Sequence, residues 1–256
     1  MFAKERYDEI IKILKQKKSV TATELSKKFG VSLETIRRDL FHLEEKGLLS
    51  RVHGGAISVS GMGEYKSLKQ RLGENTDKKI KASENAMQFI CEDDVIAVDC
   101  GSTAVEFARV LKKSFEHLTV VTHSLDVYWE LKDKDGFKLI IIGGEYSAAE
   151  DANCGFLAVD MINNLHFSKV FIFPLKISLK NGLYDQGTEY IPVQRAYIKN
   201  SDKVFYVADS SKFETIGVAR IRDIKEGDIF VTDDMINDDI KKIYEEHGIK
   251  IVSKQN

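Results

Sequence analysis

From residue 95 onward, the sequence alternates short apolar segments with amphipathic ones. The continuous hydrophobicity of the apolar segments predicts strands that are buried on both faces. Those segments are VIAVDC (95–100), LTVVTH (118–123), KLIIIGG (138–144), KVFIFP (169–174), KVFYVAD (203–209) and DIFVTDD (228–234). Between them lie helical patterns, such as Ala104, Phe107 and Leu111 on one side of a helix after the first strand. This alternation predicts an α/β domain with a mostly parallel sheet that helices cover on both faces.

Polar residues follow four of these predicted strands. In open parallel sheets, ligands bind beyond the carboxyl ends of the strands. Gly101 permits close backbone approach there, and the N–H groups of Ser102 and Thr103 open a helix whose dipole favours an anion. Lys212 adds a cation, and Asp99 can accept hydrogen bonds from sugar hydroxyls. The full candidate set is Asp99, Gly101, Ser102, Thr103, Thr122, Ser124, Gly143, Gly144 and Lys212. Hydroxyls in such places are often only helix caps, but four strand ends together favour a site for a phosphorylated polyol.

Cys100 raises the question of whether this loop is an active site. A cysteine nucleophile needs a lowered pKa and usually a base such as His123. A cysteine at a strand end is more often a small buried residue, and the spacing of Asp99, Asp209, Glu189 and Lys212 does not show the mutual reach that acid–base catalysis requires. The six histidines show no zinc-like spacing with the three cysteines. We therefore expect no catalysis, no cofactor and no metal.

The first 57 residues differ from the rest in charge. They hold 12 Lys and Arg against 8 Asp and Glu, whereas the remainder holds 26 against 32. A basic segment joined to an acidic one suggests nucleic acid as a partner of the first. Three short helices are predicted here, with a Thr21–Glu24 capping box and a stop at Gly30. The tight GVS turn before the third helix indicates a helix-turn-helix, and LLSRVHGGAI reads as a hairpin wing.

The third of these helices is the expected DNA reader. With Ile36 and Leu40 pointing inward, Thr35 and Arg38 point outward and Arg37 lies on the flank. Hydroxyls and arginines at the start of such a helix can reach base edges and phosphates in a major groove. The alternative is that both arginines are solvated charges that pair with Glu34, Glu44 or Glu45.

The segment SVTATELSKKFGVSLETIRRDLFHLEEKGLLSRVHGGA resembles the signature of the DeoR family of bacterial transcription regulators. The matching pieces are the ELSKKFGVS turn, TIRRDL in the reading helix and RVHGGA after it. The resemblance implies that Ser32, Thr35, Arg37 and Arg38 contact DNA, with Arg51 and His53 in support. We add Thr23, in the preceding helix, to the DNA-binding candidates.

The second part is similar to the effector-sensing domain of the same family. VDCGST resembles its Asp-x-Gly-Thr/Ser-Thr loop, GGEY its double glycine and VADSSKF its Asp-x-Ser-Lys segment. The resemblance implies a fold related to ribose-5-phosphate isomerase and CoA transferases, phosphorylated sugars as effectors, and a pocket built from the nine candidates above. His123 departs from the usual Asn, and Phe173 to Lys176 replace small and acidic residues. Lys176 therefore joins the effector-binding candidates, in a pocket of altered volume and charge.

We therefore expect a winged helix-turn-helix DNA-binding domain over 1–57, a linker over 58–76 with a short helical piece around 64–72, and an effector-sensing α/β domain over 77–256. No apolar run approaches the ~20 residues of a membrane span, and three widely spaced cysteines fit a reducing cytoplasm. The expected protein is a homo-oligomeric (dimeric or tetrameric) repressor of a sugar catabolic operon. Its partners are operator DNA and a phosphorylated sugar or related anionic metabolite. The alternatives are an isomerase-like enzyme with an accessory DNA-binding domain, or a regulator whose second domain only oligomerises.

Overall fold

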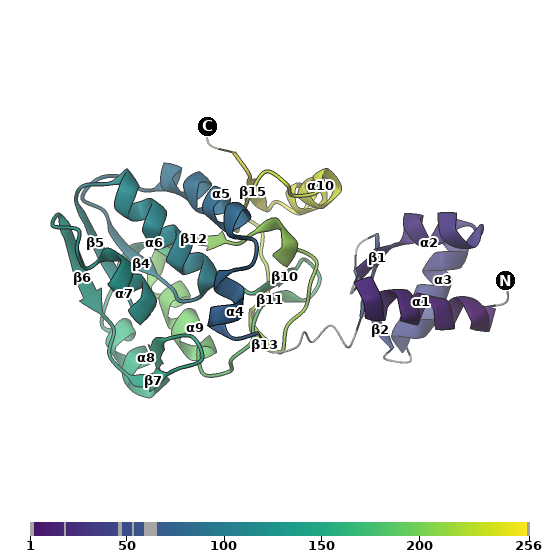
Figure 1. The fold of residues 1–256 in the computed structure, drawn as a ribbon, viewed down its shortest axis with the longest axis horizontal. Helices are drawn as coiled ribbons and strands as arrows, with labels where there is room; N and C mark the ends of the chain where they lie inside the picture. The colour runs from purple at the N-terminus through teal and green to yellow at the C-terminus, as the bar shows by residue number, and fades with distance from the viewer. Residues whose placement is uncertain (1–2, 18, 46–47, 53, 59–65, 255–256) are drawn as a thin grey trace. The chain divides into compact units, whose positions relative to one another are not determined.

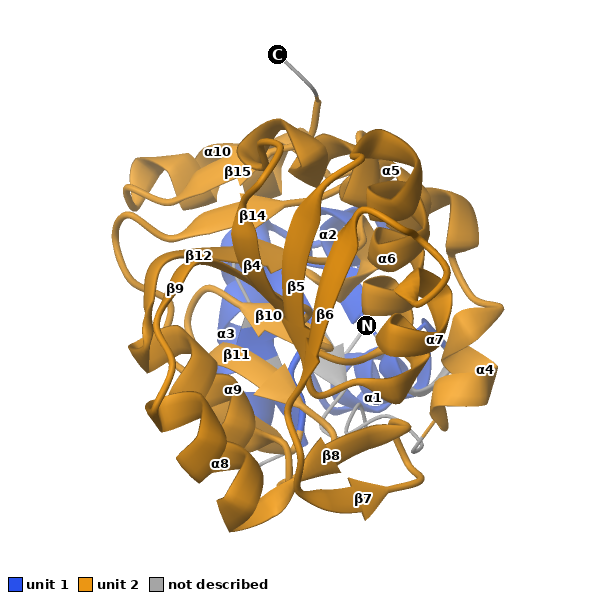
Figure 2. Cartoon of the chain, turned by 90° about the vertical axis from the view of Figure 1, so that its left-hand side faces the viewer, with its two compact units in different colours: residues 1–64, 214–217 blue, residues 65–213, 218–256 orange. Residues whose placement is uncertain are grey.

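The computed structural model describes residues 3–17, 19–45, 48–52, 54–58 and 66–254 (Figure 1). The chain divides into two units, which Figure 2 colours separately. The first comprises residues 1–64 with 214–217, and the second comprises residues 65–213 with 218–256.

The first unit contains three helices and a small antiparallel sheet. The helices are α1 (Ala3–Lys17), α2 (Ala22–Phe29) and α3 (Leu33–Glu45). The strands β1 (Ser19–Thr21), β2 (Leu49–Val52) and β3 (Gly55–Ser58) pair in the order β1-β3-β2. The expected stripe of Ile36, Leu40 and Leu43 is buried, together with Ile10 and Leu14 of α1. This apolar cluster packs the three helices and the hairpin together.

The predicted boundaries of α2 are confirmed. The Thr21 hydroxyl accepts a hydrogen bond from the Glu24 N–H at 3.1 Å, and the Thr21 N–H donates to the Glu24 carboxylate at 3.0 Å. Gly30 ends the helix in the left-handed conformation, with φ of 64°. The strand β1 was not anticipated, because three residues show no periodicity and β1 forms only by pairing with β3.

The second unit is built on a seven-stranded parallel sheet, as the strand pattern predicts. Its order is β15-β14-β12-β9-β4-β5-β6, and every pair is parallel. The strands are β4 (Val95–Val98), β5 (Leu118–Thr122), β6 (Phe137–Ile141), β9 (Phe167–Ile172), β12 (Ser201–Val207), β14 (Ile229–Val231) and β15 (Lys250–Val252). On one side of β4 lie β5 and β6, which follow it in the chain. On its other side lie β9, β12, β14 and β15, the later strands. The direction of winding therefore changes between β4 and β9.

Helices cover both faces of this sheet. One face packs on α5 (Thr76–Ala86), α6 (Ser102–Ser114) and α7 (Leu125–Leu131). The other packs on α8 (Gly155–Asn163), α9 (Ile191–Lys199) and α10 (Asp238–Glu246). The expected short helical piece is α4 (Leu68–Leu72), whereas α5, which follows it closely, was not recognised from the sequence.

Two small antiparallel sheets were also not anticipated. One pairs β7 (Glu145–Ser147) with β8 (Ala152–Cys154), and the other joins β10 (Lys176–Ser178), β11 (Gly182–Asp185) and β13 (Ala219–Arg222). Strands of three or four residues carry too little alternation to be recognised locally. Within the described part of the chain, no helix is both long and apolar enough to cross a membrane.

Candidate functional site

The helix α3 presents two exposed arginines. The side chains of Arg37 and Arg38 are 67% and 82% exposed, and each approaches the Glu34 carboxylate at 3.8 Å. Exposed ion pairs at such distances contribute little free energy, so both guanidinium groups can exchange Glu34 for another anion. The buried Arg6–Asp39 pair, with N–O distances of 2.7 and 3.0 Å, fixes α3 to α1 directly behind them. A helix held by a buried ion pair therefore carries two exposed and weakly paired arginines.

The other DNA-binding candidates differ in their surroundings. The Ser32 hydroxyl caps α3 by accepting from the Thr35 N–H at 3.2 Å, and the two hydroxyl oxygens lie 2.9 Å apart. Thr23 is exposed on α2. Arg51 lies within β2, where its N–H and its Nε donate to the Glu44 carboxylate at 2.8 and 3.0 Å. His53 lies outside the described residues.

In the second unit, the loop after β4 opens at the point where the winding direction changes. Gly101 adopts φ of 114°, which glycine tolerates best, and it stands at the N-terminus of α6. No side chain caps this helix end. Ser102 and Thr103 follow in its first turn and are only 5% and 7% exposed. The site thus has the free N–H groups and the positive dipole end that bind anions.

A buried ion pair flanks this helix end. Arg71 of α4 donates to the Glu150 carboxylate, which lies in the turn between β7 and β8. A Cβ on Gly101 would lie 3.9 Å from Arg71 Nη1 and 4.0 Å from Glu150 Oε2. Burial raises the pKa of Glu150 to about 7, against the lowering effect of the Arg71 charge. The arginine therefore faces the site already paired with a carboxyl group that can take up a proton.

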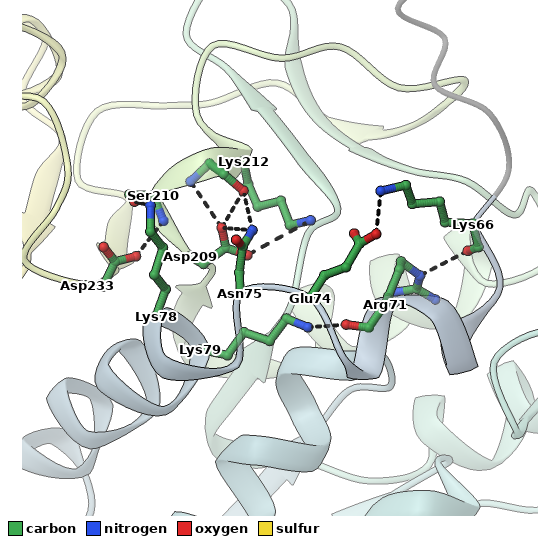
Figure 3. A network of polar contacts seen from close by, with 11 residues as sticks. Lys66, Arg71, Glu74, Asn75, Lys78, Lys79, Asp209, Ser210, Lys212 and Asp233 are labelled. Carbon is green, nitrogen blue, oxygen red and sulfur yellow. Dashed lines mark hydrogen bonds and ion pairs between the residues drawn. The ribbon is translucent and has the colours of Figure 1, made fainter.

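Two lysines extend the cationic surroundings. Figure 3 shows Lys79 coming from α5 and Lys212 from the short turn Ser210–Lys212 after β12. Lys79 is 1% exposed, and its ammonium donates to the Arg71 carbonyl. Burial and the nearby Lys212 charge lower the pKa of Lys79 to about 8. Burial also lowers the pKa of Lys212, although Asp209, at 3.9 Å, opposes this. An additional anion would relieve the repulsion between these cations.

Asp99 lies beneath the loop. It is fully buried, and its Oδ2 accepts from Gln194 Nε2 at 3.0 Å and from the Phe173 N–H at 3.4 Å. Its Oδ1 lies 3.5 Å from Nε2 of the fully buried His123. Burial and the Asp185 charge raise the pKa of Asp99 to about 7. Asp99 is therefore buried and holds the loop through these hydrogen bonds. From the sequence, its carboxylate was expected to face sugar hydroxyls.

The candidates after β5 and β6 have local structural tasks. The Thr122 hydroxyl accepts from the Ser124 N–H at 3.1 Å, and the Ser124 hydroxyl caps α7 by accepting from the Val127 N–H at 3.3 Å. Gly144 is required by packing, since a Cβ there would lie 2.4 Å from the Cys154 carbonyl. Gly143 is exposed with open space around it.

The segment from Phe173 to Lys176 is mostly core. Phe173 and Leu175 are 6% and 7% exposed, and the Phe173 ring packs edge-on against Phe107 of α6, with 5.4 Å between centroids. Lys176 opens β10 and is half-buried. Phe173 thus packs against α6.

Cys100 is buried, as expected for a small packing residue. Burial and the neighbouring Asp99 raise the pKa of its thiol well above the usual value, so the thiol stays protonated at neutral pH. A protonated thiol is a poor nucleophile.

Sequence reasoning missed Arg71, Glu150 and Lys79. Arg71 fell in the expected linker, although Ser67 and Gln70 form a capping box that marks the start of α4. Lys79 shares a helical face with Ala82 and Ala86, and a lysine on such an apolar face was the available signal. Glu150 had no local signal, because its partner lies 79 residues away.

Solved structures with a similar arrangement match only part of the chain. Ribose 5-phosphate isomerase A from Neisseria gonorrhoeae has a TM-score of 0.40 and 18% identity, over 57% of this chain and 55% of its own. The translation factor subunit eIF2B beta from Chaetomium thermophilum has a TM-score of 0.46 and 14% identity, over 70% and 59% of the two chains.

Sequence relatives match nearly the whole chain. The HTH-type transcriptional regulator GolR of Listeria innocua is 30% identical over 98% of both chains. The L-fucose operon activator of Haemophilus influenzae is 30% identical over 96% of this chain and 98% of its own, and the lactose phosphotransferase system repressor of Lactococcus lactis is 30% identical over 93% of each. Family models match residues 6–61 as a DeoR-like helix-turn-helix domain and residues 74–234 as a DeoR C terminal sensor domain. The chain therefore belongs to the DeoR family of transcription regulators.

Proposed function

We propose that this protein represses genes of carbohydrate metabolism by binding their operator through α3, and that a phosphorylated sugar releases it. Ser32, Thr35, Arg37 and Arg38 share the first turns of α3, which supports a role as the reading helix. The names of relatives that regulate fucose and lactose genes support the choice of carbohydrate. Thr23, Arg51 and His53 are proposed as supporting contacts to the DNA backbone.

One observation carries the ligand half of the proposal: the uncapped N-terminus of α6 lies beside the buried Arg71. A phosphate there would accept from the N–H groups of Ser102 and Thr103 and from the Arg71 guanidinium. The ammonium groups of Lys79 and Lys212 would also attract the phosphate, and burial strengthens this attraction. The remaining candidates, Asp99, Thr122, Ser124, Gly143, Gly144 and Lys176, are proposed to shape the site.

The Arg71–Glu150 pair offers a route from binding to response. A phosphate at the helix end competes with Glu150 for Arg71, and Glu150 lies on the turn between β7 and β8. A ligand shifts an equilibrium only by its different affinity for the two states. We propose that the state in which Arg71 binds phosphate has the lower operator affinity.

Three further properties belong to this proposal. Residues 1–57 serve DNA binding and residues 77–256 serve sensing, joined through 58–76. The protein acts in the cytoplasm as a dimer or tetramer, because one small module binds specific DNA weakly whereas paired half-sites add affinity. The sensor binds its ligand without turnover, since the relatives of the chain are named as transcription regulators and the Cys100 thiol is protonated.

The experiment combines thermal unfolding with operator binding. Sugar phosphates should raise the melting temperature of the wild-type chain and release DNA from its own upstream region. Lys212→Ala should abolish both ligand effects and leave DNA binding intact. Thr103→Ala keeps the backbone N–H, so a loss of the ligand effects in this variant would show that the Thr103 hydroxyl also contacts the phosphate. Lys203→Ala is the matched control, because Lys203 is exposed near the start of the strand that leads to Lys212.

The same experiment separates the alternatives. Loss of DNA binding in Lys212→Ala with an unchanged ligand response would place the ligand elsewhere. Steady conversion of a sugar phosphate, lost in Lys212→Ala, would establish an isomerase-like enzyme. A chain that no sugar phosphate stabilises, and whose oligomer dissociates without residues 77–256, would have a second domain that only oligomerises.

A further inference from the structure

We propose that Asp99, Cys100 and His123 bind a zinc-type transition metal ion beneath the loop that opens α6. One ligand atom from each residue, a carboxylate oxygen, a sulfur and a ring nitrogen, lies within 4.8 Å of the other two. All three residues are buried, with exposures of 0%, 5% and 0%. The spacing of histidines and cysteines along the sequence gave no sign of such a site, because the fold brings the three residues together.

The sheet register creates this juxtaposition. Val98 of β4 lies opposite Thr122 of β5, so the residues that follow, Asp99 and His123, leave adjacent parallel strands side by side. The distance from Asp99 Oδ1 to His123 Nε2 is 3.5 Å. Tetrahedral zinc with ligand bonds of about 2.0–2.3 Å holds its ligand atoms roughly 3.3–3.8 Å apart. This pair therefore already has the spacing of a zinc site, and Cys100 Sγ lies within 4.8 Å of both atoms.

Several buried polar atoms at this place make no hydrogen bond within the described part of the chain. Among the described residues, neither ring nitrogen of His123, nor Asp99 Oδ1, nor the Tyr197 hydroxyl makes a hydrogen bond. The Tyr197 ring lies next to His123, with 5.6 Å between centroids. Leaving a buried polar group unsatisfied costs about 1–3 kcal/mol, and several together cost more. A bound ion would satisfy the imidazole and the carboxylate at once.

The chemistry of the three groups selects the ion. Thiolate and imidazole are ligands for zinc and related metals, whereas magnesium and calcium prefer oxygen ligands. The imidazole of His123 offers ring nitrogens that make no hydrogen bond among the described residues. A metal ion displaces the thiol proton of Cys100 on binding, and its positive charge compensates the buried thiolate and carboxylate. Three protein ligands leave a fourth position, which water occupies in zinc sites of this kind.

The position gives the ion a structural consequence. Cys100 directly precedes Gly101, so a bound metal would fix the loop that presents the N-terminus of α6. The ion would bind without a sugar phosphate or an operator, because its ligands are three protein side chains and a water molecule.

The test uses the full chain, stripped with a chelator and then mixed with Co²⁺ or Zn²⁺. We expect one Co²⁺ per chain with a thiolate-to-cobalt charge-transfer band, and one Zn²⁺ that survives desalting and abolishes the band. Cys100→Ser and His123→Asn should lose the band and the bound metal. Cys91→Ser is the matched control: Cys91 is a free, exposed cysteine outside the cluster, and this variant should keep both.

Two results would overturn the proposal. One is a wild-type chain that retains no stoichiometric Zn²⁺ and shows no cobalt band. The other is a band that persists in Cys100→Ser and disappears in Cys91→Ser, which would indicate a surface thiol. Circular dichroism establishes that each variant is folded, and His123→Asn decides the outcome if Cys100→Ser is not. Neither measurement involves DNA or a sugar phosphate, so failure here leaves the proposed regulatory function standing.

Discussion

Arg38 of α3 and Arg71 of α4 are both arginines, but the first is exposed to solvent and the second is buried. Arg38 is 82% exposed and has a loose contact with Glu34, whereas the Arg71 side chain is 9% exposed and paired with a buried carboxylate. DNA brings its phosphates and base edges to a protein surface, so a reading arginine must stay extended and free to exchange partners. A small anion gives up most of its water on binding, so its site must be prearranged. These settings fit the proposed roles of the two units, which are DNA binding for the first and binding of a small anion for the second.

The largest predicted effect is the loss of stability of the second unit when Arg71 is replaced. Arg71→Ala leaves the Glu150 carboxyl buried without its partner, and breaking buried pairs costs about 3–5 kcal/mol. We expect about 3 kcal/mol, because the pKa of Glu150 is already about 7 and the group can take up a proton. Denaturant unfolding followed by fluorescence of the single tryptophan, Trp129 of α7, reports on this unit. Arg71→Ala combined with Glu150→Gln should recover part of the loss. If the single and double variants were equally unstable, the loss would not come from the unpaired Glu150 carboxyl.

Arg38→Ala should weaken operator binding and leave the stability of the first unit nearly unchanged. Loss of a bidentate arginine–base contact costs about 1–3 kcal/mol, so operator affinity should fall roughly 5- to 150-fold. Stability should change by less than about 0.5 kcal/mol, as is usual for surface substitutions. Fluorescence anisotropy with operator and unrelated DNA measures the specific loss. Lys12→Ala, which removes an exposed cation from α1, is the control. An equal loss of operator affinity in both variants would mean that Arg38 contributes only its positive charge.

The third prediction concerns pH and Lys79. Only the protonated lysine attracts an anion, and its pKa is lowered to about 8 in the ligand-free protein. The contribution of Lys79 to sugar phosphate affinity should therefore be full well below pH 8, and affinity should decline as the pH rises above 8, up to about tenfold per unit. Isothermal titration calorimetry across this range measures the decline. In Lys79→Met affinity should be lower throughout and the step should vanish, so a step that persists would assign the titration to another group.

The smallest effect is expected at Ser32. Ser32→Ala removes the cap of α3 and should destabilise the first unit by about 1 kcal/mol. Ser32→Asn keeps a good cap without adding charge, and thermal unfolding followed by circular dichroism should show nearly wild-type stability. Operator binding then separates the two roles of Ser32. Normal affinity in Ser32→Asn means that Ser32 acts only as a cap, whereas weakened affinity means that its hydroxyl contacts DNA.

Local patterns predicted most of the architecture. The Thr21–Glu24 capping box, the stop at Gly30 and the stripe from Ile36 to Leu43 are all present in the structure. The six apolar segments are strands of one parallel sheet, which gains a seventh strand, β15. Each of these features depends on residues within a few positions of one another. By contrast, α5 was missed because Lys79 interrupts its apolar face, and the small sheets were missed because their strands pair only within the folded chain.

The sequence by itself determined the family, the order of helices and strands, the exposed arginines of α3 and the glycine that opens α6. Helical period, caps and turn residues encode these over short distances. Only the tertiary structure decided which side chains share a site. Arg71 meets Glu150 across 79 residues, Gln194 meets Asp99 across 95, and His123 meets Asp99 through the register of β4 and β5. It also turned Asp99 and Phe173, which the sequence placed beside the ligand, into supports beneath and behind the loop. Periodicity specifies which face of an element is buried, but the partners on that face are set by how the elements pack.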